Sequence, residues 1–518
     1  MPLSLGRPAL EPSGSSNVMP ILSSVGMVVI AVTPAYLTGA LAVQIRGELG
    51  FGPAALGVAV SWFFLTSSLA SAPMGQAVER LGVRRSLAMG AVGTSLGLVG
   101  LGTTMSFTWM LLAMALCGLS NATTQPAVNV VLSTRISSSR LGLAFGIKQA
   151  GIPMATLIAG LAIPTASVLV GWRGTFLLAA GAALTGGITA WYRGARGAGA
   201  VGHTKRRIRD VPEVGPLILL SAGGLLGGAA ATSLGVFMVD AAVDGGIREA
   251  SAGLMFAMVS AGGLLSRILM GWYADGHPAR SRYGTIAFLL LIAVPGYLML
   301  TLGTPLVYLL GASLAYIAGW AWPGLFHFAV VSQNPLTPAA ATGLIQTGLS
   351  LGAGLGPMAF GYVAETRGYA SAWVLAAVLS AASGVVILFG REYLRRHRRQ
   401  ASASHLDEVL ALVWEDGDPT IVASGVQLQR RSTEHLRVTI YQVTPGANYE
   451  PGPARRTGVV FVVAGSEAQL NISGVDTVVA PRDHLPLPAN RTWRLSNRGV
   501  TTSLIAQVEH EGNHYTTG

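Results

Sequence analysis

Charged residues and cysteine are scarce in this sequence. Asp, Glu, Lys and Arg make up 11% of the 518 residues, whereas charged residues form about a quarter of a typical soluble domain. Hydrophobic residues account for 51%, and the mean hydropathy is +0.53. The single cysteine, Cys117, lies within an apolar run, which excludes a disulfide framework and a thiol-rich metal site. The composition indicates an integral membrane protein, because too few charges remain to solvate a soluble fold of this length.

Lysine is almost absent, since Lys148 and Lys205 are the two lysines among 34 basic residues. This arginine bias, beside much alanine and glycine, suggests a GC-rich bacterial source. The net charge is +11, but most basic residues fall in short connections between apolar runs. Because such charges orient helices in a membrane, we expect a lipid bilayer as partner and no nucleic acid. The first 17 residues are too polar for a signal peptide and are expected to be a cytoplasmic tail.

Apolar runs long enough to cross a bilayer recur along the chain. A crossing needs about 20 apolar residues. Twelve runs meet this length, at about 18–43, 54–74, 86–105, 109–132, 141–169, 175–191, 216–239, 252–272, 285–302, 305–331, 339–363 and 371–389. Counted along the chain, the connections that lead from an even-numbered run to the next odd-numbered run contain most of the Arg and Lys residues, above all between Arg193 and Arg209. The positive-inside rule therefore predicts cytoplasmic termini and a multi-pass protein of the plasma membrane.

The two halves of the apolar region resemble each other. Gly57 and Gly75 match Gly253 and Gly271 at an offset of 196. At an offset of 197, Pro126 matches Pro323, and the segment 146–151 matches 343–348. A nearly constant offset across three helix pairs indicates an internal repeat. We therefore expect an all-α membrane region of twelve helices, built as two six-helix pseudo-repeats.

After about residue 400 the pattern changes from long apolar runs to short alternating ones. Residues 436–443, 459–470 and 504–508 alternate apolar and polar side chains, and Pro-Gly, Ala-Gly and Ser-Gly turns separate them. This pattern predicts a small all-β domain. The expected organisation is an N-terminal tail 1–17, a first bundle 18–192, a basic linker 193–214, a second bundle 215–390, a basic tail and linker 391–425, and a cytoplasmic β domain 426–518.

A charged turn lies between the second and third apolar runs. It reads Gly75-Gln-Ala-Val-Glu79-Arg80-Leu-Gly82-Val-Arg84-Arg85, and Gly271-Trp-Tyr-Ala-Asp275 repeats it loosely in the second half. The segment resembles the loop signature of the major facilitator superfamily, although Glu79 stands where aspartate is usual. The resemblance, which extends over 18–390, implies a transporter that works by alternating access. It also implies a gating latch made by Gly75, Glu79, Arg80, Gly82, Arg84, Arg85, Gly271 and Asp275. The alternative interpretation is ordinary loop charge that only orients the chain.

Other segments indicate which members of the superfamily the chain resembles. Gly171-Trp-Arg-Gly-Thr-Phe176 resembles a turn common in the superfamily. Gly146-Ile-Lys148-Gln149-Ala-Gly151-Ile-Pro153 and Gly319-Trp-Ala-Trp-Pro-Gly324 resemble a bacterial subgroup related to cyanate and nitroimidazole transporters. The helix that contains Arg267 is similar locally to monocarboxylate carriers, in which an arginine meets the substrate carboxylate.

Two cations fall inside apolar runs. Lys148 lies about 12 Å of helical rise into its run, close to the depth at which such transporters hold substrate. Because Ile345 occupies the matching position in the second half, the architecture does not require the charge. Charge at this depth is costly and usually functional, so we predict that Lys148 and Arg267 bind an anionic group. In the alternative, both side chains snorkel to the interface.

Further polar and aromatic residues complete the predicted substrate site. Asn121, Gln125 and Asn129 are spaced by four and share one face of a helix. The other candidates are Tyr36, Gln149, Trp320, Trp322, His327 and Gln346. Hydrogen bonding between helices and ordinary packing are the competing roles. The acids Glu79, Asp240, Asp275 and Glu365 lie near helix ends and none falls mid-helix, so the sequence does not support proton coupling through a carboxylate. His327 is the other group in the membrane region placed to titrate near neutral pH.

The β domain resembles a cupin barrel that has lost its metal ligands. The positions of the first cupin motif read Gly446, Gly452, Ala454, Gly458 and Gly465, and those of the second read Arg482, Pro488, Asn490, Trp493 and Asn497. A metal dioxygenase needs ligands that these residues cannot supply. We expect no metal, no cofactor and no enzymatic activity. The β domain is expected to sense a ligand or to support assembly; the alternative is that it is only a structural appendage. The sequence thus favours transport of a small organic solute, with an organic anion as the expected class. The alternative is a non-transporting receptor that binds a small molecule and signals through the β domain.

Overall fold

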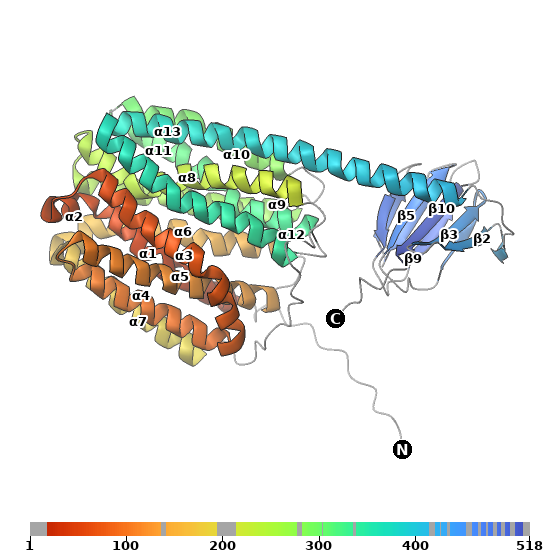
Figure 1. Ribbon diagram of the computed structural model, residues 1–518, viewed down its shortest axis with the longest axis horizontal. Coiled ribbons are helices and arrows are strands. Elements are labelled where there is room, and N and C mark those ends of the chain that lie inside the picture. The colour runs from red at the N-terminus through yellow and green to blue at the C-terminus, as the bar shows by residue number, and fades with distance from the viewer. Residues whose placement is uncertain are drawn as a thin grey trace, which may run out of the picture. The chain divides into compact units, whose positions relative to one another are not determined.

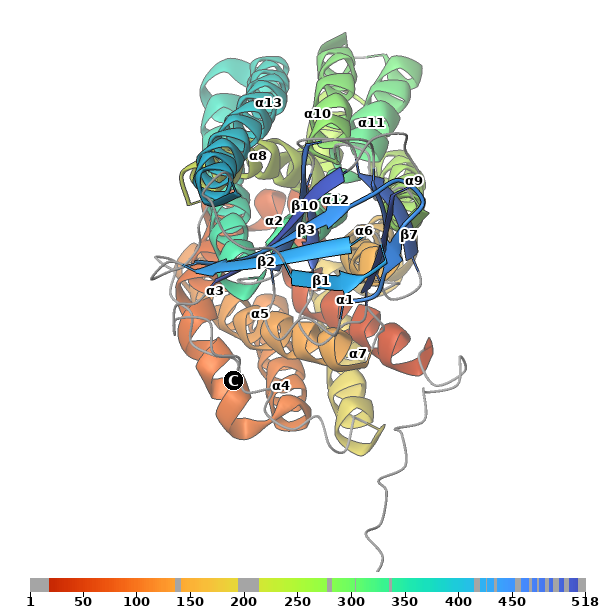
Figure 2. The same cartoon turned by 90° about the vertical axis from the view of Figure 1, so that its right-hand side faces the viewer.

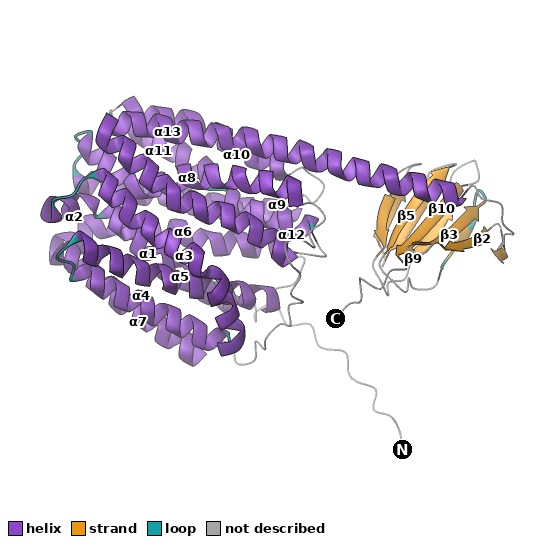
Figure 3. Cartoon of the chain, in the orientation of Figure 1, coloured by secondary structure: helices purple, strands orange, loops and turns teal. Residues whose placement is uncertain are grey.

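The computed structural model describes residues 18–135, 141–193, 214–276, 282–302, 304–334, 338–413, 420–424, 426–432, 436–451, 458–464, 468–472, 475–479, 484–487, 493–497 and 503–510. The chain divides into two compact units, Met1–Leu394 and Arg395–Gly518. Helices build the first unit, and the strands belong to the second (Figure 3). The predicted tail 1–17 and most of the predicted linker 193–214 lie outside the described residues.

The first unit consists of two successive sets of helices (Figure 1). The first half contains α1 (Val18–Ala40), α2 (Ala42–Leu49), α3 (Pro53–Leu81), α4 (Val83–Gly102), α5 (Phe107–Arg135), α6 (Leu141–Ala162), a π-helical turn (Ile163–Ser167) and α7 (Val168–Arg193). The second half contains α8 (Val214–Asp244), α9 (Glu249–Gly276), α10 (Arg282–Met299), a 3₁₀ turn (Leu300–Leu302), α11 (Pro305–Gly319), α12 (Trp322–Gln333) and α13 (Pro338–Val413).

Nine helical segments of the described chain are long and apolar enough to cross a membrane. Segments 146–189 and 340–396 exceed the length of one crossing, and each contains a glycine with left-handed backbone, Gly171 at φ 69° and Gly368 at φ 82°. A third segment, Pro305–Gln333, is interrupted between α11 and α12. The nine do not include α4. The structure thus supports a mostly helical membrane protein, and twelve crossings remain a prediction.

Close helix packing joins the two halves. α6 packs along α9, and α1 packs against α8. A Cβ on Gly160 would lie 2.7 Å from the backbone of Ala257, and a Cβ on Gly39 would lie 2.5 Å from the carbonyl oxygen of Val236. These positions therefore require glycine. Within the halves, α4 lies beside α7 and α10 beside α11 (Figure 2).

The two ends of the helical unit carry different connections. The segment between α1 and α3, which contains α2, lies at one end, called here the α2 end. α3 spans 29 residues, or roughly 40 Å at 1.5 Å per residue, so the turn at Gly82 lies at the opposite end. Gly82 joins α3 to α4 with φ 82°, a conformation that favours glycine.

The second unit contains two antiparallel sheets. Their strands are β1 (Thr420–Ala423), β2 (Val426–Ser432), β3 (Leu436–Val443), β4 (Asn448–Tyr449), β5 (Gly458–Ala464), β6 (Ala468–Ile472), β7 (Val475–Val479), β8 (His484–Leu487), β9 (Trp493–Asn497) and β10 (Ser503–His510). The orders are β1-β2-β3-β10-β5-β8 and β4-β9-β6-β7. In the described residues the sheets form no closed barrel, unlike the predicted one, because each ends in edge strands. The alternating run 459–470 divides into β5 and β6.

Side chains from both sheets share one core. Tyr441 of β3 meets Trp493 of β9 edge to face, with ring centroids 5.7 Å apart. Leu470 and Ile505 are fully buried in the same cluster. The inward faces of the two sheets therefore pack together as a sandwich.

Candidate functional site

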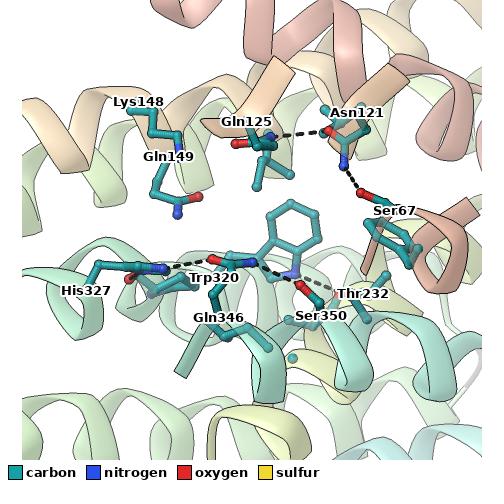
Figure 4. A pocket seen from close by; sticks show the side chains of 18 of the residues that line it. Ser67, Asn121, Gln125, Lys148, Gln149, Thr232, Trp320, His327, Gln346 and Ser350 are labelled. Carbon is teal, nitrogen blue, oxygen red and sulfur yellow. Dashed lines mark hydrogen bonds between the residues drawn. The ribbon is translucent and has the colours of Figure 1, made fainter. Parts of the chain in front are cut away.

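A cavity of about 250 Å³ lies between the two halves of the helical unit (Figure 4). Its wall includes every residue that the sequence analysis proposed for substrate binding: Tyr36, Asn121, Gln125, Asn129, Lys148, Gln149, Arg267, Trp320, Trp322, His327 and Gln346. The structure thus brings these residues to one place. Their role in binding remains a prediction.

Lys148 enters the cavity from α6. The residue is 7% exposed, and its Nζ donates a hydrogen bond to Asn129 Oδ1 at 2.8 Å. This partner is a neutral amide on α5. Among the residues that the structure describes in the cavity wall there is no Asp or Glu to form an ion pair with this ammonium.

Arg267 enters from α9 and is held by backbone carbonyls of both halves. Nε donates to the Trp320 carbonyl oxygen at 2.6 Å, and Nη1 donates to the carbonyl oxygen of Gln149. The guanidinium also lies 5.2 Å from the centre of the Trp320 ring, a cation–π arrangement. Arg267 is 4% exposed. Its hydrogen-bond partners Trp320 and Gln149 again supply no negative charge.

Polar side chains of α5 and α3 form one wall. Gln125 Nε2 donates to Asn121 Oδ1 at 3.3 Å, and Asn121 Nδ2 donates to Ser67 Oγ at 2.8 Å. Because Asn121, Gln125 and Asn129 are four residues apart along α5, all three lie on this wall. Sequence reasoning missed Ser67, and also Ser71, Thr232 and Ser350, because short hydroxyl residues are common in membrane helices and carry no distinctive spacing.

Tyr36 and Trp320 contribute aromatic rings to another wall, and Tyr316 packs on Trp320 without lining the cavity. The rings of Tyr316 and Trp320 stack at 4.3 Å, and Tyr36 of α1 lies 5.7 Å from Trp320. Trp320 Nε1 donates to the Ala231 carbonyl oxygen at 2.8 Å, which fixes the indole. A Cβ on Gly235 would lie 2.7 Å from this indole. The glycine therefore makes room for the tryptophan, a relation that no sequence pattern reveals.

His327 of α12 lies at the start of a polar chain. Its Nδ1 is 2.8 Å from the Pro323 carbonyl oxygen, and its Nε2 is 2.9 Å from Gln346 Oε1. Gln346 Nε2 in turn donates to Ser350 Oγ at 3.0 Å. Figure 4 shows this chain along the α13 side of the cavity.

The predicted latch residues lie at the Gly82 end. Arg80 and Arg85 are exposed, and the Arg84 guanidinium lies 4.4 Å from the ring centre of Trp191, which belongs to the same half. Gly75 is part of α3, and Gly271 of α9 packs closely on Gly146. The side chains of Glu79 and Asp275 lie outside the described residues, so the proposed pairing between acids and arginines is untested.

Polar contacts between the halves gather at the α2 end. Arg46 of α2 forms an ion pair with Asp240 of α8, and Tyr369 of α13 donates a hydrogen bond to the same carboxylate. Two further contacts cross between the halves: Gln44 Nε2 donates to Glu249 Oε1 at 2.8 Å, and the Ala54 N–H donates to Glu365 Oε2 at 2.8 Å. The sequence analysis did not propose this cluster.

The described cupin-motif positions have structural roles in the β unit. Trp493 is 1% exposed in the core, and Asn497 Nδ2 donates to the Val443 carbonyl oxygen at 2.9 Å. Gly446 adopts φ 78° in a turn. The other motif positions, except Gly458 in β5, lie outside the described residues. Across the part of the chain that is described, no three His, Cys, Asp or Glu side chains group to hold a metal ion.

Comparisons with known proteins agree with this architecture. Monocarboxylate transporter 11 of Mus musculus is 29% identical over 363 residues, which are 64% of this chain and 77% of that protein. Crystal structures of a bacterial homolog of the human lysosomal transporter Spinster, inward-facing and either occupied or unoccupied, superpose with a TM-score of 0.56. They share 17% identity and cover 75% of this chain and 98% of theirs, which shows the fold alone. These relatives are transporters and not enzymes. The sequence profile of the Major Facilitator Superfamily matches residues 23–332 and 220–430, so this chain belongs to that superfamily of membrane transporters.

Proposed function

We propose that the chain carries a small organic anion across the membrane by alternating access through the central cavity. The observation that carries this proposal is the charge of the cavity wall. Lys148 and Arg267 contribute two cations from opposite halves, and the described residues of the wall include no Asp or Glu.

The two buried cations, Lys148 and Arg267, are costly to hold inside a membrane. A cation removed from water inside a membrane protein is expensive unless a negative group or many dipoles surround it. Asn129 and two carbonyl groups supply dipoles to Lys148 and Arg267, but no negative charge. A carboxylate in the cavity would supply it. Local likeness to monocarboxylate carriers points to the same class of substrate, and a volume of about 250 Å³ favours a small one.

The distribution of contacts supports alternating access. An ion pair and hydrogen bonds join the two halves at the α2 end. We infer that the α2 end faces outward and is closed here, and that the Gly82 end, with its latch of charged residues, closes in the opposite state. In this arrangement the termini are cytoplasmic, the chain crosses the plasma membrane twelve times, and the β unit is a cupin-like cytoplasmic domain without metal.

Binding of matched acids and amides tests the substrate class. Purified protein in detergent is heated with pyruvate, lactate or benzoate, and in parallel with pyruvamide, lactamide or benzamide. Ligand at about 100 times its Kd stabilises a protein by about 2.7 kcal/mol, so a carboxylate that binds raises Tm and its neutral amide does not. We expect Lys148→Ala to lose most of this Tm shift, because it removes one of the two cations.

Lys148→Arg is the control, since it retains the charge and is expected to retain part of the shift. Equal stabilisation by acids and amides, or equal shifts in the wild type and Lys148→Ala, would contradict an anion site. Counterflow of the stabilising carboxylate in proteoliposomes then separates a carrier from a receptor, because a receptor binds without exchange.

A further inference from the structure

The cavity continues beyond Lys148 as a line of neutral hydrogen-bonding side chains. On α5, Asn129 accepts a hydrogen bond from Lys148. Gln125 and Asn121 line the cavity at successive intervals of four residues toward the start of α5. An α-helix rises about 1.5 Å per residue, so Asn121 lies about 12 Å from Asn129 along the helix axis. Figure 4 shows Lys148 at one side of the cavity and Asn121 with Ser67 at the other. The site is therefore elongated, with the Lys148 charge toward one end.

Several of these side chains have hydrogen-bonding capacity left for a ligand. Gln149 is 9% exposed and lines the cavity, yet its side-chain amide has no hydrogen-bond partner among the described residues. Gln125 donates to Asn121, but its Oε1 accepts no hydrogen bond from the described part of the chain. Ser67 accepts from Asn121, and no described residue accepts the hydrogen of its own hydroxyl. A buried amide or hydroxyl without a partner is costly, so a ligand that fills this space has to form hydrogen bonds with these groups.

Both halves contribute such groups to the wall. Thr232 of α8 and Ser350 of α13 add hydroxyl groups, and Figure 4 shows them on the side of the cavity away from Lys148. Protein amides and hydroxyls both donate and accept hydrogen bonds. A ligand hydroxyl also does both, whereas a methylene group does neither. A carbon chain with several hydroxyl groups therefore matches this wall better than an aliphatic chain does. The described wall residues include no Asp or Glu that would pair with an amine.

We propose that the cavity selects a polyhydroxylated carboxylate, a sugar acid in chemical class. Its carboxylate lies at Lys148, and its hydroxyl groups exchange hydrogen bonds with Gln149, Gln125 and the side chains around Asn121. A short aliphatic acid occupies the Lys148 end alone. A longer aliphatic acid fills the cavity but leaves the amides and hydroxyls unpaired, and a site built to hydrogen-bond hydroxyl groups rejects ligands that lack them. This inference rests on the proposed anion site and specifies the class of anion that it takes.

Three six-carbon ligands separate the contribution of charge from that of the hydroxyl groups. Gluconate carries both, hexanoate carries the charge alone, and sorbitol carries the hydroxyl groups alone. The Kd of each is measured by isothermal titration calorimetry on the purified protein in detergent. We expect gluconate to bind at least about tenfold more tightly than hexanoate. Sorbitol should bind at least about tenfold more weakly than gluconate, because it forms no charge pair with Lys148.

Two variants assign this preference to named side chains. Gln125→Leu and Gln149→Leu keep the size of the side chain and remove its hydrogen bonds. Each should reduce the preference for gluconate over hexanoate by about tenfold without weakening hexanoate. Gln442→Leu, at an exposed position of β3 in the other unit, is the matched control and should keep the full preference. Lys148→Ala should weaken both acids and leave their ratio near that of the wild type.

The outcomes distinguish this inference from the anion site on which it rests. Hexanoate that binds the wild type as tightly as gluconate, or an unchanged preference in both glutamine variants, overturns the inference and leaves the anion site standing. Binding of pyruvate without binding of gluconate does the same. Sorbitol that binds as tightly as gluconate, or absence of binding by every carboxylate, refutes the anion site itself.

Discussion

At the scale of single residues, Glu48 shows how a charge at the α2 end is fixed. Its carboxylate accepts hydrogen bonds from Arg173 Nη2 at 2.8 Å and from Trp172 Nε1 at 2.7 Å. The Arg173 guanidinium also lies 4.3 Å from the centre of the Trp172 ring. These hydrogen bonds, that from Arg173 first, lower the pKa of the Glu48 carboxyl below its ordinary value. The cluster therefore ties α2 to the start of α7.

The lowered pKa predicts a stability difference that depends on pH. A carboxyl with a lower pKa in the folded state stabilises the fold above its unfolded pKa, about 4.3 for glutamate, and loses this contribution as pH falls through the folded pKa. Glu48→Gln should therefore have a lower Tm than the wild type at pH 7, and the gap should close in acid. Thermal denaturation from pH 3 to pH 7 measures it. A gap that is constant over this range would show that the carboxylate charge is unimportant.

Residues of the cavity could be predicted from the sequence where their side chains are unusual for an apolar run. Lys148 and Arg267 stood out because cations are rare in apolar runs, and the spacing of Asn121, Gln125 and Asn129 gave them a common face. Tyr316 was missed because its stacking on Trp320 follows from the break between α11 and α12. The carbonyl partners of Arg267 were equally hidden, since backbone groups are the same at every position.

At the scale of elements, glycines set the distance between α3 and α13. A Cβ on Gly57 would lie 2.3 Å from the Pro357 carbonyl oxygen, and a Cβ on Gly361 would lie 2.4 Å from that of Pro53. Such contacts involve backbone atoms, which cannot rotate away. The two helices can therefore approach at the α2 end only while both positions lack side chains.

Gly57→Ala should separate these helices. Overpacking costs about 1–3 kcal/mol, so we expect a clear fall in Tm and reduced counterflow of the transported anion. Gly181→Ala on α7 is the matched control, because no atom lies within 4 Å of its Cβ position. That control should be neutral or slightly stabilised, since alanine favours helix more than glycine does. Equal Tm values for the two variants would contradict a role of Gly57 in packing.

Element boundaries were less predictable than element types. Run length and repeat offset indicated the helices, but apolar composition continues through Trp320 and Ala321, where the helix is interrupted. The left-handed turn at Gly368 divides α13 in the same way. Because the chain contains 67 glycines, the position of this one could not be predicted as a break. In the β unit, two edge-bounded sheets replaced the expected barrel because alternation fixes which face is buried but not which strands pair.

At the scale of the whole helical unit, a few polar contacts hold its two halves together at the α2 end. Asp240 is 4% exposed and binds both Arg46 and Tyr369. Glu365 accepts from the first turn of α3, where a Cβ on Gly52 would lie 2.2 Å from its Oε2. The contacts of Asp240 with Arg46 and of Glu365 with the Ala54 N–H join one half to the other. A state that is open at the α2 end has to break both.

Asp240→Asn should shift the population toward that state, because it removes one charge of a largely buried pair. A change of about 1.4 kcal/mol alters the ratio of two states tenfold. Met105 and Leu306 are both exposed near this end. Spin labels attached to Met105→Cys and Leu306→Cys report the distance between the halves by electron–electron double resonance. We expect a larger fraction of long distances in Asp240→Asn and little change in Asp244→Asn, the exposed acid four residues later. Identical distance distributions would show that Asp240 does not hold this end closed.

The burial of Cys117 has a practical consequence for such work. It is the chain's single cysteine, its side chain is 0% exposed, and a Cβ on Gly97 would lie 2.2 Å from its Sγ. A thiol enclosed in this way between α4 and α5 is out of reach of aqueous maleimides. The unaltered protein therefore serves as the negative control for thiol labelling. A cysteine introduced at the cavity or at either end of the helical unit is then the residue that a thiol-reactive probe labels.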